Sequence, residues 1–373
     1  MRWCRSCVLP DTRPNLTIGA DGVCNACRNH ATKRVIDWDH RAAHFASVAA
    51  NARARANGGY DCLIPVSGGK DSTWQVVTCL EHGLRPLCVT WRTPGRTAIG
   101  EANLRNLIDL GVDHIDFTID PQTERRFMLK ALERFGDPAI PMHMAIFSIP
   151  LRLAAQMRIP LIVWGENSAF EYGGTEEESR GFALDAAWLR RFGVTHGTAA
   201  ADWEDGDITV RHLLPYRLPD ESALAQAGTL AVFLGYYFPW DPETSLAVAR
   251  THGFRADPRG ARTGLYDYAD IDDDFISVHH WFKWHKFGFT RLFDNLSLEI
   301  RNGRIGRADA IAIIRARGDD TPHDDIARLC GFLDITEDRL HSIAETFRNK
   351  AVWHRQGGVW TIPDFLIPDW TWS

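Results

Sequence analysis

The sequence predicts an α/β fold: a parallel sheet covered by helices, preceded by a small cysteine-rich module and followed by a mainly helical region. Short apolar runs alternate with helical patterns between Tyr60 and Trp164, which is typical of parallel sheets buried on both faces. Two C-x2-C pairs lie within the first 30 residues, and helical spacing dominates after Phe275. The length of 373 residues exceeds one ordinary core, so we expect several parts.

The expected division follows changes in composition along the chain. It comprises a cysteine module at 1–30, a helical connector at 31–58, the sheet domain at 59–200, and the mainly helical region at 201–373.

Individual elements follow from apolar runs and helical spacing. The expected strands are 60–66, 87–91, 114–118 and 159–164. The expected helices are 71–82, 101–110, 127–135, 145–157, 309–317, 325–333 and 337–348. Residues 175–265 are less regular, and the apolar segment 362–372 is expected to pack on its own body or on another subunit, which is compatible with a homo-oligomer.

Composition excludes several classes of protein. An apolar fraction of 45% and a charged fraction of 24% are those of a soluble globular protein. A formal net charge of −6 argues against general affinity for nucleic acid. We find no secretory signal and no apolar run long enough for a membrane span, so we expect a cytoplasmic protein without a membrane partner.

The first four cysteines have metal-ligand spacing. Cys4-x2-Cys7 and Cys24-x2-Cys27 are separated by sixteen residues, which fits a tetrahedral, structural Zn²⁺ site. The alternatives, four unrelated thiols or a redox pair, explain this arrangement less well. The remaining cysteines lie in apolar surroundings and are expected to be packing residues: Cys62, Cys79, Cys88 and Cys330.

The clearest functional pattern is a glycine-rich loop directly after a buried strand. It consists of Ser67, Gly68, Gly69, Lys70, Asp71 and Ser72. Glycines allow close backbone approach to an anion, and the helix that follows directs N–H groups at the same point. Asp71 suits an anion site only if it holds a Mg²⁺ that neutralises phosphates. A plain strand–helix turn would explain the glycines but not all six residues in this order.

Two later segments are candidates for the rest of the site. Gly165, Glu166 and Asn167 follow the strand 159–164, at the same edge of the sheet as the loop. Further on, Lys286 and Arg291 are candidates for binding a phosphate or diphosphate, with Asp294 fixing Arg291.

Other residues near these segments leave alternatives open. The aspartates 272–274 suit a helix cap and a metal or substrate site about equally. The histidines 279, 280 and 285, mixed with aromatics, would also suit RNA stacking, but the acidic net charge favours a small anionic ligand.

The loop resembles the PP-loop of the ATP pyrophosphatase superfamily, which has the adenine nucleotide α-hydrolase-like fold. The resemblance implies that the loop grips the β- and γ-phosphates of ATP while a substrate oxygen attacks the α-phosphate. It also implies that the second strand contacts adenine around Val89 and Thr90. Residues 59–200 would then be the ATP-binding domain.

A narrower resemblance rests on further strings. The cysteine pairs, I-P-L-I-V-W-G-E-N, E-Y-G-G, L-G-Y-Y-F-P-W-D and K-F-G-F-T-R, together with D-N-L-S-L-E-I-R-N-G-R, are similar to those of N-acetyl sugar amidotransferases. That family acts in bacterial surface-polysaccharide, including lipopolysaccharide O-antigen, and nonulosonic acid pathways. The implied reaction converts the acetamido group of a nucleotide-linked sugar to an acetamidino group.

The family resemblance implies roles for individual residues. The implied catalytic residues are Lys70, Asp71, Glu166, Lys286 and Arg291. The implied ATP-binding residues are the loop 67–72, Val89, Thr90 and Gly165. The implied substrate-binding residues are Asn167, Glu171, Tyr172, Gly173, Gly174 and Asp294.

The ammonia source is expected to be another protein. Residue 2 is Arg rather than a nucleophilic Cys, and the chain has no G-x-C-x-G elbow. The resemblance implies a separate glutaminase together with a cyclase-like tunnel subunit. Two rival readings are a PP-loop sulfurtransferase acting on tRNA or a small molecule, and a non-catalytic zinc-bearing assembly factor.

Overall fold

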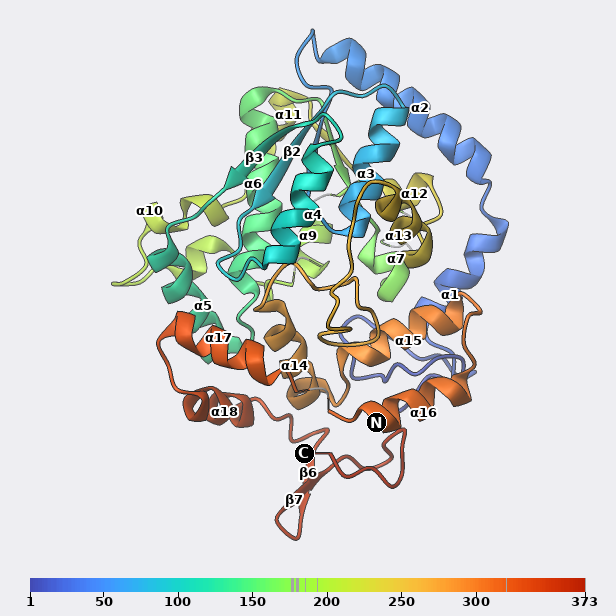
Figure 1. Ribbon diagram of the computed structural model, residues 1–373, viewed down its shortest axis with the longest axis vertical. Helices are drawn as coiled ribbons and strands as arrows, with labels where there is room; N and C mark the ends of the chain where they lie inside the picture. Colours follow the sequence, from blue (N-terminus) through green and yellow to red (C-terminus); the bar gives the residue numbers. More distant parts are fainter. Residues whose placement is uncertain (176–177, 179–180, 185, 193, 320, 373) are drawn as a thin grey trace.

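A parallel sheet forms the centre of the computed structural model, which describes residues 1–175, 178, 181–184, 186–192, 194–319 and 321–372. Within them, five strands form one parallel sheet in the order β3-β2-β1-β4-β5 (Figure 1). The strands are β1 Cys62–Pro65, β2 Pro86–Trp91, β3 Asp113–Phe117, β4 Leu161–Trp164 and β5 Leu230–Phe233. The predicted α/β class and parallel sheet are confirmed. Because β2 and β4 flank β1 on opposite sides, the carboxyl ends of β1 and β4 border a crevice where such sheets bind ligands.

Helices cover both faces of the sheet. Alternate residues of β1 separate two cores: Leu63 packs with α6, whereas Ile64 packs with α2 and α3. The helices up to β5 are α1 Asn25–Thr32, α2 Trp38–Arg55, α3 Lys70–Glu81, α4 Ala98–Ile108, α5 Pro121–Phe135, α6 Ile140–Met157, α7 Ser168–Tyr172, α9 Ala186–Phe192, α10 Val210–Leu213 and α11 Glu221–Ala227. Short 3₁₀ turns occur at η1 Lys33–Val35, η2 Ala200–Trp203 and η3 Leu214–Tyr216.

Among the described helices, none combines the length and the apolar character that crossing a bilayer requires.

Three of the differences from the sequence expectation have a clear physical or topological basis. Helix α5 begins at Pro121 because Asp120 caps it, accepting a hydrogen bond from the Thr123 backbone N–H at 3.0 Å. Helix α6 begins at Ile140, with Pro141 in the first turn, where no N–H donor is needed. Strand β5 was not predicted and extends the sheet past residue 200, where we drew a boundary; the domain division itself stays a prediction.

The chain after β5 is mainly helical, as expected. Its elements are α12 Leu234–Tyr237, α13 Pro242–Thr251, α14 Ile276–Phe287, α15 Arg291–Arg301, α16 Arg307–Arg317, α17 His323–Leu333, α18 Glu337–Thr346 and the antiparallel pair β6 His354–Gln356 with β7 Val359–Thr361. A long loop, residues 252–275, connects α13 to α14 (Figure 1).

The two ends of the chain share one core. Cys4 and Leu9 belong to the same buried cluster as Trp284 and Phe365, and Trp3 donates a hydrogen bond from Nε1 to the Asp364 carbonyl at 2.9 Å. The N and C labels lie close together in Figure 1 for this reason. The expectation that the aromatic segment 362–372 packs on its own body is confirmed.

Candidate functional site

The glycine-rich loop joins β1 to α3 and faces the crevice. Gly68 has φ +84°, and a Cβ there would lie 2.5 Å from the backbone nitrogen of Leu104, so only glycine fits. Gly69 is the N-cap of α3, and Ser67 Oγ accepts from its N–H at 3.2 Å. The free N–H groups and the positive dipole end of α3 therefore meet at the loop, an arrangement that suits phosphate.

Lys70 and Asp71 are held by a tryptophan far away in sequence. Lys70 Nζ lies 2.6 Å from Asp71 Oδ2 and 5.4 Å from the centre of the Trp240 ring. Trp240 donates from Nε1 to Asp71 Oδ1 at 2.9 Å. Trp240 stood in one of the strings that carried the family resemblance, but nothing in the sequence assigned it to the loop.

Two adjoining cavities open beside the loop, with volumes of about 380 Å³ and 200 Å³. Both are bordered by Ser67, Asp71, Glu166, Asp270 and Asp272. The larger cavity is further lined by Ser72, Gln75, Val89, Thr90, Thr93, Arg96, Ile146, Pro150 and Gly165, among others. The smaller cavity is further lined by Gly69, Lys70, Tyr172, Trp240, Tyr266, Tyr268, Arg291 and Asn295, among others. The predicted residues Ser72, Val89, Thr90 and Gly165 thus gather at the larger cavity.

Helix α6 contributes Ile146 and Pro150 to the lining of the larger cavity. Pro150 has no N–H, so the carbonyl of Ile146 lacks its usual helical donor.

Four carboxylate side chains, those of Asp71, Glu166, Asp270 and Asp272, border both cavities. Burial, with Asp71 next in weight, raises the pKa of Glu166 to about 7. Burial also raises the pKa of Asp272. Burial of Asp270 acts in the same direction, but Arg291 and His280 outweigh it and hold the Asp270 pKa well below its ordinary range. Such a set of oxygen ligands suits a Mg²⁺ ion bound together with phosphates.

The alternatives left open for the aspartates 272–274 are resolved residue by residue. Asp272 borders both cavities, and Asp273 lines the larger one while it accepts from the Phe275 backbone N–H at 2.8 Å, just before α14. Asp274 pairs with Arg262 instead. Two of the three aspartates thus border the candidate site, and one of these also orders the start of the helix.

The expected partner of Arg291 is wrong. Arg291 donates from Nε to Asp270 at 3.1 Å, whereas Asp294 is bound by Arg13 at 2.8 Å and by Lys283 at 3.3 Å. Asp294 is 1% exposed, one turn further along α15, and faces α14 and the cysteine module.

Lys286 is remote from the two cavities. Its Nζ donates to the carbonyls of Phe135 and Gly136, at 3.1 and 3.4 Å, at the end of α5. It is not among the described residues that line either cavity.

In the segment after β4, some of the predicted residues line a cavity and others make structural contacts. Glu166 and Tyr172 line cavities, but Asn167 caps α7 and accepts from Trp188 Nε1 at 3.2 Å. Gly173 packs against Asn25, and Asn25 donates to the Gly174 carbonyl at 3.2 Å. Three of the implied substrate residues therefore hold this segment against its neighbours, including the cysteine module.

Glu171 connects the cysteine module to the loop. It is 4% exposed and pairs with Lys33 at 2.8 Å. Lys33 Nζ also donates to the Trp240 carbonyl at 3.1 Å, and Trp240 in turn binds Asp71. A continuous series of contacts thus joins residues 1–35 to the phosphate loop.

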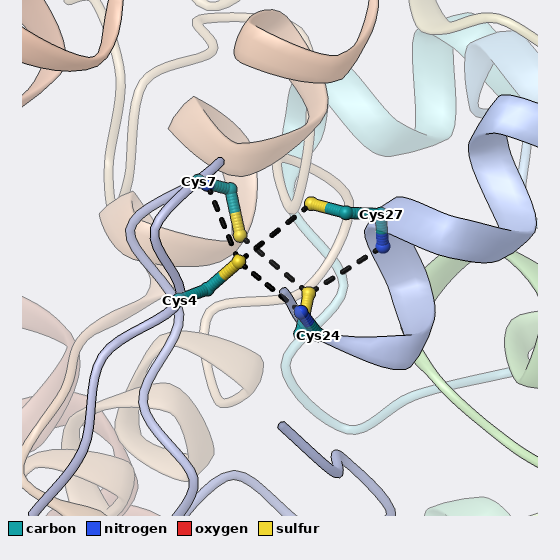
Figure 2. A group of neighbouring side chains, drawn as sticks. All are labelled: Cys4, Cys7, Cys24 and Cys27. Carbon is teal, nitrogen blue, oxygen red and sulfur yellow. Dashed lines mark hydrogen bonds between the residues drawn. The ribbon is translucent and has the colours of Figure 1, made fainter. Parts of the chain in front are cut away.

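The four N-terminal cysteines point toward a common centre (Figure 2). Their sulfurs all lie within 4.8 Å of one another, with 3.8 Å between Cys7 and Cys24 and 4.0 Å between Cys4 and Cys27. Sulfurs about 2.3 Å from a tetrahedral Zn²⁺ would stand about 3.8 Å apart. The Cys24 N–H donates to Cys4 Sγ at 3.3 Å, which stabilises thiolate. The four side chains could therefore hold a metal ion, and their geometry fits zinc.

Comparison with known proteins gives one informative match. Residues 263–365 match a protein family described as "LPS biosynthesis protein WbpG-like, C-terminal domain". No curated protein matches the chain. The solved structure of NMN synthetase from Francisella tularensis is 10% identical, covers 58% of this chain and 93% of its own, and has a TM-score of 0.26, too low to carry an argument. The C-terminal part of the chain, which supplies Tyr266, Asp270 and Arg291 to the smaller cavity, is thus similar to a domain of LPS biosynthesis proteins.

Proposed function

We propose that this protein is an ATP-dependent amidotransferase of the PP-loop superfamily that converts the N-acetyl group of a nucleotide-linked sugar to an acetamidino group. The observation that carries the proposal is the phosphate loop at the start of α3, which faces a junction of carboxylates between two cavities. A reaction between ATP and a second substrate needs two adjoining sites of this kind. The similarity of residues 263–365 to an LPS biosynthesis domain supports a sugar substrate for surface-polysaccharide or nonulosonic acid synthesis.

The larger cavity suits ATP. Its volume of about 380 Å³ lies within the usual range for small-molecule sites, and Val89 and Thr90 line it where the second strand ends. The loop would hold the phosphates, and the carboxylates of Asp71 and Glu166 would hold Mg²⁺ with them. When bound, Mg²⁺ would neutralise charge on the phosphates and on the departing pyrophosphate. Cys4, Cys7, Cys24 and Cys27 would hold a structural Zn²⁺.

The proposed chemistry has two steps. The acetamido oxygen attacks the α-phosphorus of ATP, an O–P bond forms, and pyrophosphate leaves. Ammonia then adds to the activated carbon and AMP departs with the former acetamido oxygen, so nitrogen replaces oxygen. ATP is required because the oxygen of an amide is otherwise a poor leaving group.

The chain's own residues have defined tasks in this scheme. Lys70 and the N–H groups of α3 stabilise charge that develops on the phosphates. Glu166 holds the cation in its deprotonated form, which predominates above its raised pKa of about 7, and the proton that the acetamido nitrogen loses on activation passes to solvent. Arg291 faces the smaller cavity and supports binding of an anionic acceptor.

A mass-spectrometric screen tests the proposal. Nucleotide-linked N-acetyl sugars are incubated with the protein, ATP, Mg²⁺ and NH₄⁺, and each product is compared with its substrate. We expect AMP, pyrophosphate and a product lighter by the difference between an oxygen atom and an NH group. The absence of AMP with every N-acetyl sugar would contradict the proposal and favour a non-catalytic assembly factor.

The nitrogen source is tested separately. We propose that a separate glutaminase, with a tunnel subunit, delivers ammonia in the cell. The chain alone should then use NH₄⁺ but not glutamine. Equal turnover with glutamine and NH₄⁺ by the isolated chain would contradict the need for a partner.

The buried cysteines favour this proposal over sulfur transfer. Cys62, Cys79 and Cys88 are fully buried, Cys330 is 3% exposed, and none of the four lines either cavity among the described residues. A persulfide carrier would have to reach the loop. If a variant with all four cysteines replaced by Ala retains turnover, the sulfurtransferase alternative is excluded. If the variant folds but loses turnover, that alternative is favoured again.

A further inference from the structure

The smaller cavity is walled by aromatic rings from three separate segments. Tyr172 comes from α7, Trp240 follows α12, and Tyr266 and Tyr268 belong to the 252–275 loop. Tyr266 and Tyr268 stack on each other with ring centres 4.7 Å apart and planes 18° from parallel. A cavity that combines several aromatic rings with charged side chains suits a ring-shaped ligand that also carries polar groups.

Two cations accompany these rings. Lys70 Nζ lies 5.4 Å from the Trp240 ring centre and 6.0 Å from that of Tyr268. Among the described residues, Arg291 donates one hydrogen bond, from Nε to Asp270, so its two terminal nitrogens are left for a ligand. Guanidinium N–H pairs bind phosphate and carboxylate oxygens well. The ligand that fits is a ring compound that carries an anionic group.

The aromatic wall is held in place before any ligand binds. Gly264, at φ +71°, packs so closely on α15 that a Cβ would lie 2.2 Å from Asn295 Oδ1. Asn295 Oδ1 also accepts from the Leu265 N–H at 3.0 Å. Further along the loop, Thr97 Oγ1 donates to the Ile271 carbonyl at 2.6 Å. Because the loop is anchored on both sides of Tyr266 and Tyr268, little ordering cost remains for binding.

The volume of the smaller cavity limits what enters. At about 200 Å³ it is below the usual range of about 300–1,000 Å³ for drug-sized ligands. It can therefore hold one sugar ring but not a whole nucleotide sugar. Its boundary with the larger cavity is the place where an acetamido oxygen could meet the α-phosphate.

We propose that the smaller cavity is the acceptor subsite, in which Tyr268 and Trp240 pack against the sugar ring while Arg291 binds an anionic group of the same molecule. The acetamido group points toward Asp71 and Glu166, and the nucleoside lies outside the cavity. This assignment rests on the proposed function and adds the residues that select the acceptor.

Binding measurements test the subsite without turnover. Calorimetry is carried out with UDP-N-acetylglucosamine, with UDP-glucose as a matched ligand lacking the acetamido group, and with a non-hydrolysable ATP analogue. We expect Tyr268→Ala to weaken binding of UDP-N-acetylglucosamine by about tenfold, equivalent to about 1.4 kcal/mol, because the sugar ring loses an aromatic face against which it packs. Binding of the ATP analogue should stay within about twofold, and Tyr268→Phe should restore acceptor binding.

A remote tyrosine provides the matched control. Tyr60 precedes β1, and its hydroxyl donates to Asp113 at 2.9 Å, at the opposite end of the sheet. Tyr60→Ala should leave both ligands unaffected. Equal weakening of both ligands by Tyr268→Ala, or no weakening of either, would overturn the subsite, as would failure of the wild-type protein to bind UDP-N-acetylglucosamine.

The subsite and the reaction can fail independently. If acceptor binding depends on Tyr268 but no AMP forms with any N-acetyl sugar, the subsite stands and the proposed function is wrong. If AMP forms and Tyr268→Ala leaves the KM of the turned-over sugar unchanged, the function stands and the subsite is wrong.

Discussion

The two cavities have different foundations. The larger one is formed at the ends of β1, β2 and β4 and by one face of α6, so its walls follow from the sheet. The smaller one is assembled from α3, α7, α15 and the loops around Ser67, Glu166, Trp240 and Tyr266, and its Tyr172 segment is held to the helical connector by the pair of Lys33 and Glu171. Arg13 strengthens this support, because its guanidinium lies 5.2 Å from the Tyr172 ring centre. Perturbations far from the site should therefore affect the smaller cavity first.

Removing the support of Glu171 should have the largest effect. Lys33→Met leaves a carboxylate that is 4% exposed without its cation, and breaking a buried pair in this way costs about 3–5 kcal/mol. We expect the free energy of unfolding to fall by that order in urea titrations, and acceptor binding to weaken more than ATP binding.

The control lies in the neighbouring cysteine module. Arg28 pairs with Asp21 on the surface, where side-chain exposures are 44% and 57%. Arg28→Met should leave the unfolding midpoint unchanged, and Lys33→Arg should recover part of the loss. Equal destabilisation by the Arg28 and Lys33 substitutions would refute the special role of the buried pair.

Removing a carboxylate at the junction should affect both cavities. Glu166→Gln keeps the shape but loses the charge, and loss of one electrostatic group at a reacting centre lowers kcat by about 10²–10³-fold. AMP release measured at saturating ATP and acceptor checks this. Glu204→Gln, on an exposed residue, is the matched control and should retain full activity.

The same carboxylate predicts a pH dependence. Its pKa is raised from 4.5 to about 7, so the cation-binding form is lost as pH falls through about 7. Below that value Mg²⁺ affinity should decline by about tenfold per pH unit, and Glu166→Gln should flatten the profile. Since the folded protein holds this proton where the unfolded chain does not, this group's contribution to stability falls as pH rises from 4.5 to about 7. If the pH profile of Mg²⁺ affinity is identical in the wild type and the variant, Glu166 is not the group that causes the pH dependence.

Filling the larger cavity should separate it from the smaller one. Ile146 lines the larger cavity but not the smaller one. Ile146→Trp should therefore raise the KM for ATP by about tenfold, equivalent to about 1.4 kcal/mol. The KM for the acceptor should change by no more than about twofold. Steady-state kinetics with each substrate varied in turn measure this. A larger effect on the acceptor would mean that the two cavities are assigned the wrong way round.

The smallest effect is expected at Lys286. Lys286→Met removes hydrogen bonds to two carbonyls at the end of α5, which costs about 1 kcal/mol of stability. Both KM values and kcat should stay unchanged, because Lys286 lies away from both cavities. A large fall in kcat with normal stability would restore the catalytic role that the sequence resemblance implied.

The sequence predicted the larger cavity far better than the smaller one. Ser67–Ser72 and Gly165–Glu166 follow buried strands, and the ends of parallel strands meet at one edge wherever they lie in the chain. Strand β5 escaped prediction because Leu230–Phe233 is a short apolar run inside an irregular region. Tyr266 and Tyr268 have no periodic pattern around them, and only the packing of the long loop brings them to the site.

A short sequence motif can also suggest a wrong site when its residues belong to different structural elements. Lys286 and Arg291 are close in sequence, but Lys286 lies at the end of α14 and Arg291 begins α15. The intervening turn sends one to α5 and the other to the cavity. Likewise Gly173 and Gly174 looked like a ligand loop but serve as a contact for Asn25. Composition and spacing cannot distinguish these cases, because each depends on contacts more than a hundred residues apart in sequence.

The shared core of the two chain ends has a consequence for biosynthesis. The cysteine module is synthesised before its packing partners Trp284, Phe293 and Phe365, which follow some hundreds of residues later. At translation rates of about 5–20 residues per second, the thiols wait on the order of tens of seconds for that cover. During this interval they are exposed to oxidation and to competing metals, so the supply of metal during synthesis should influence how many chains reach the folded state.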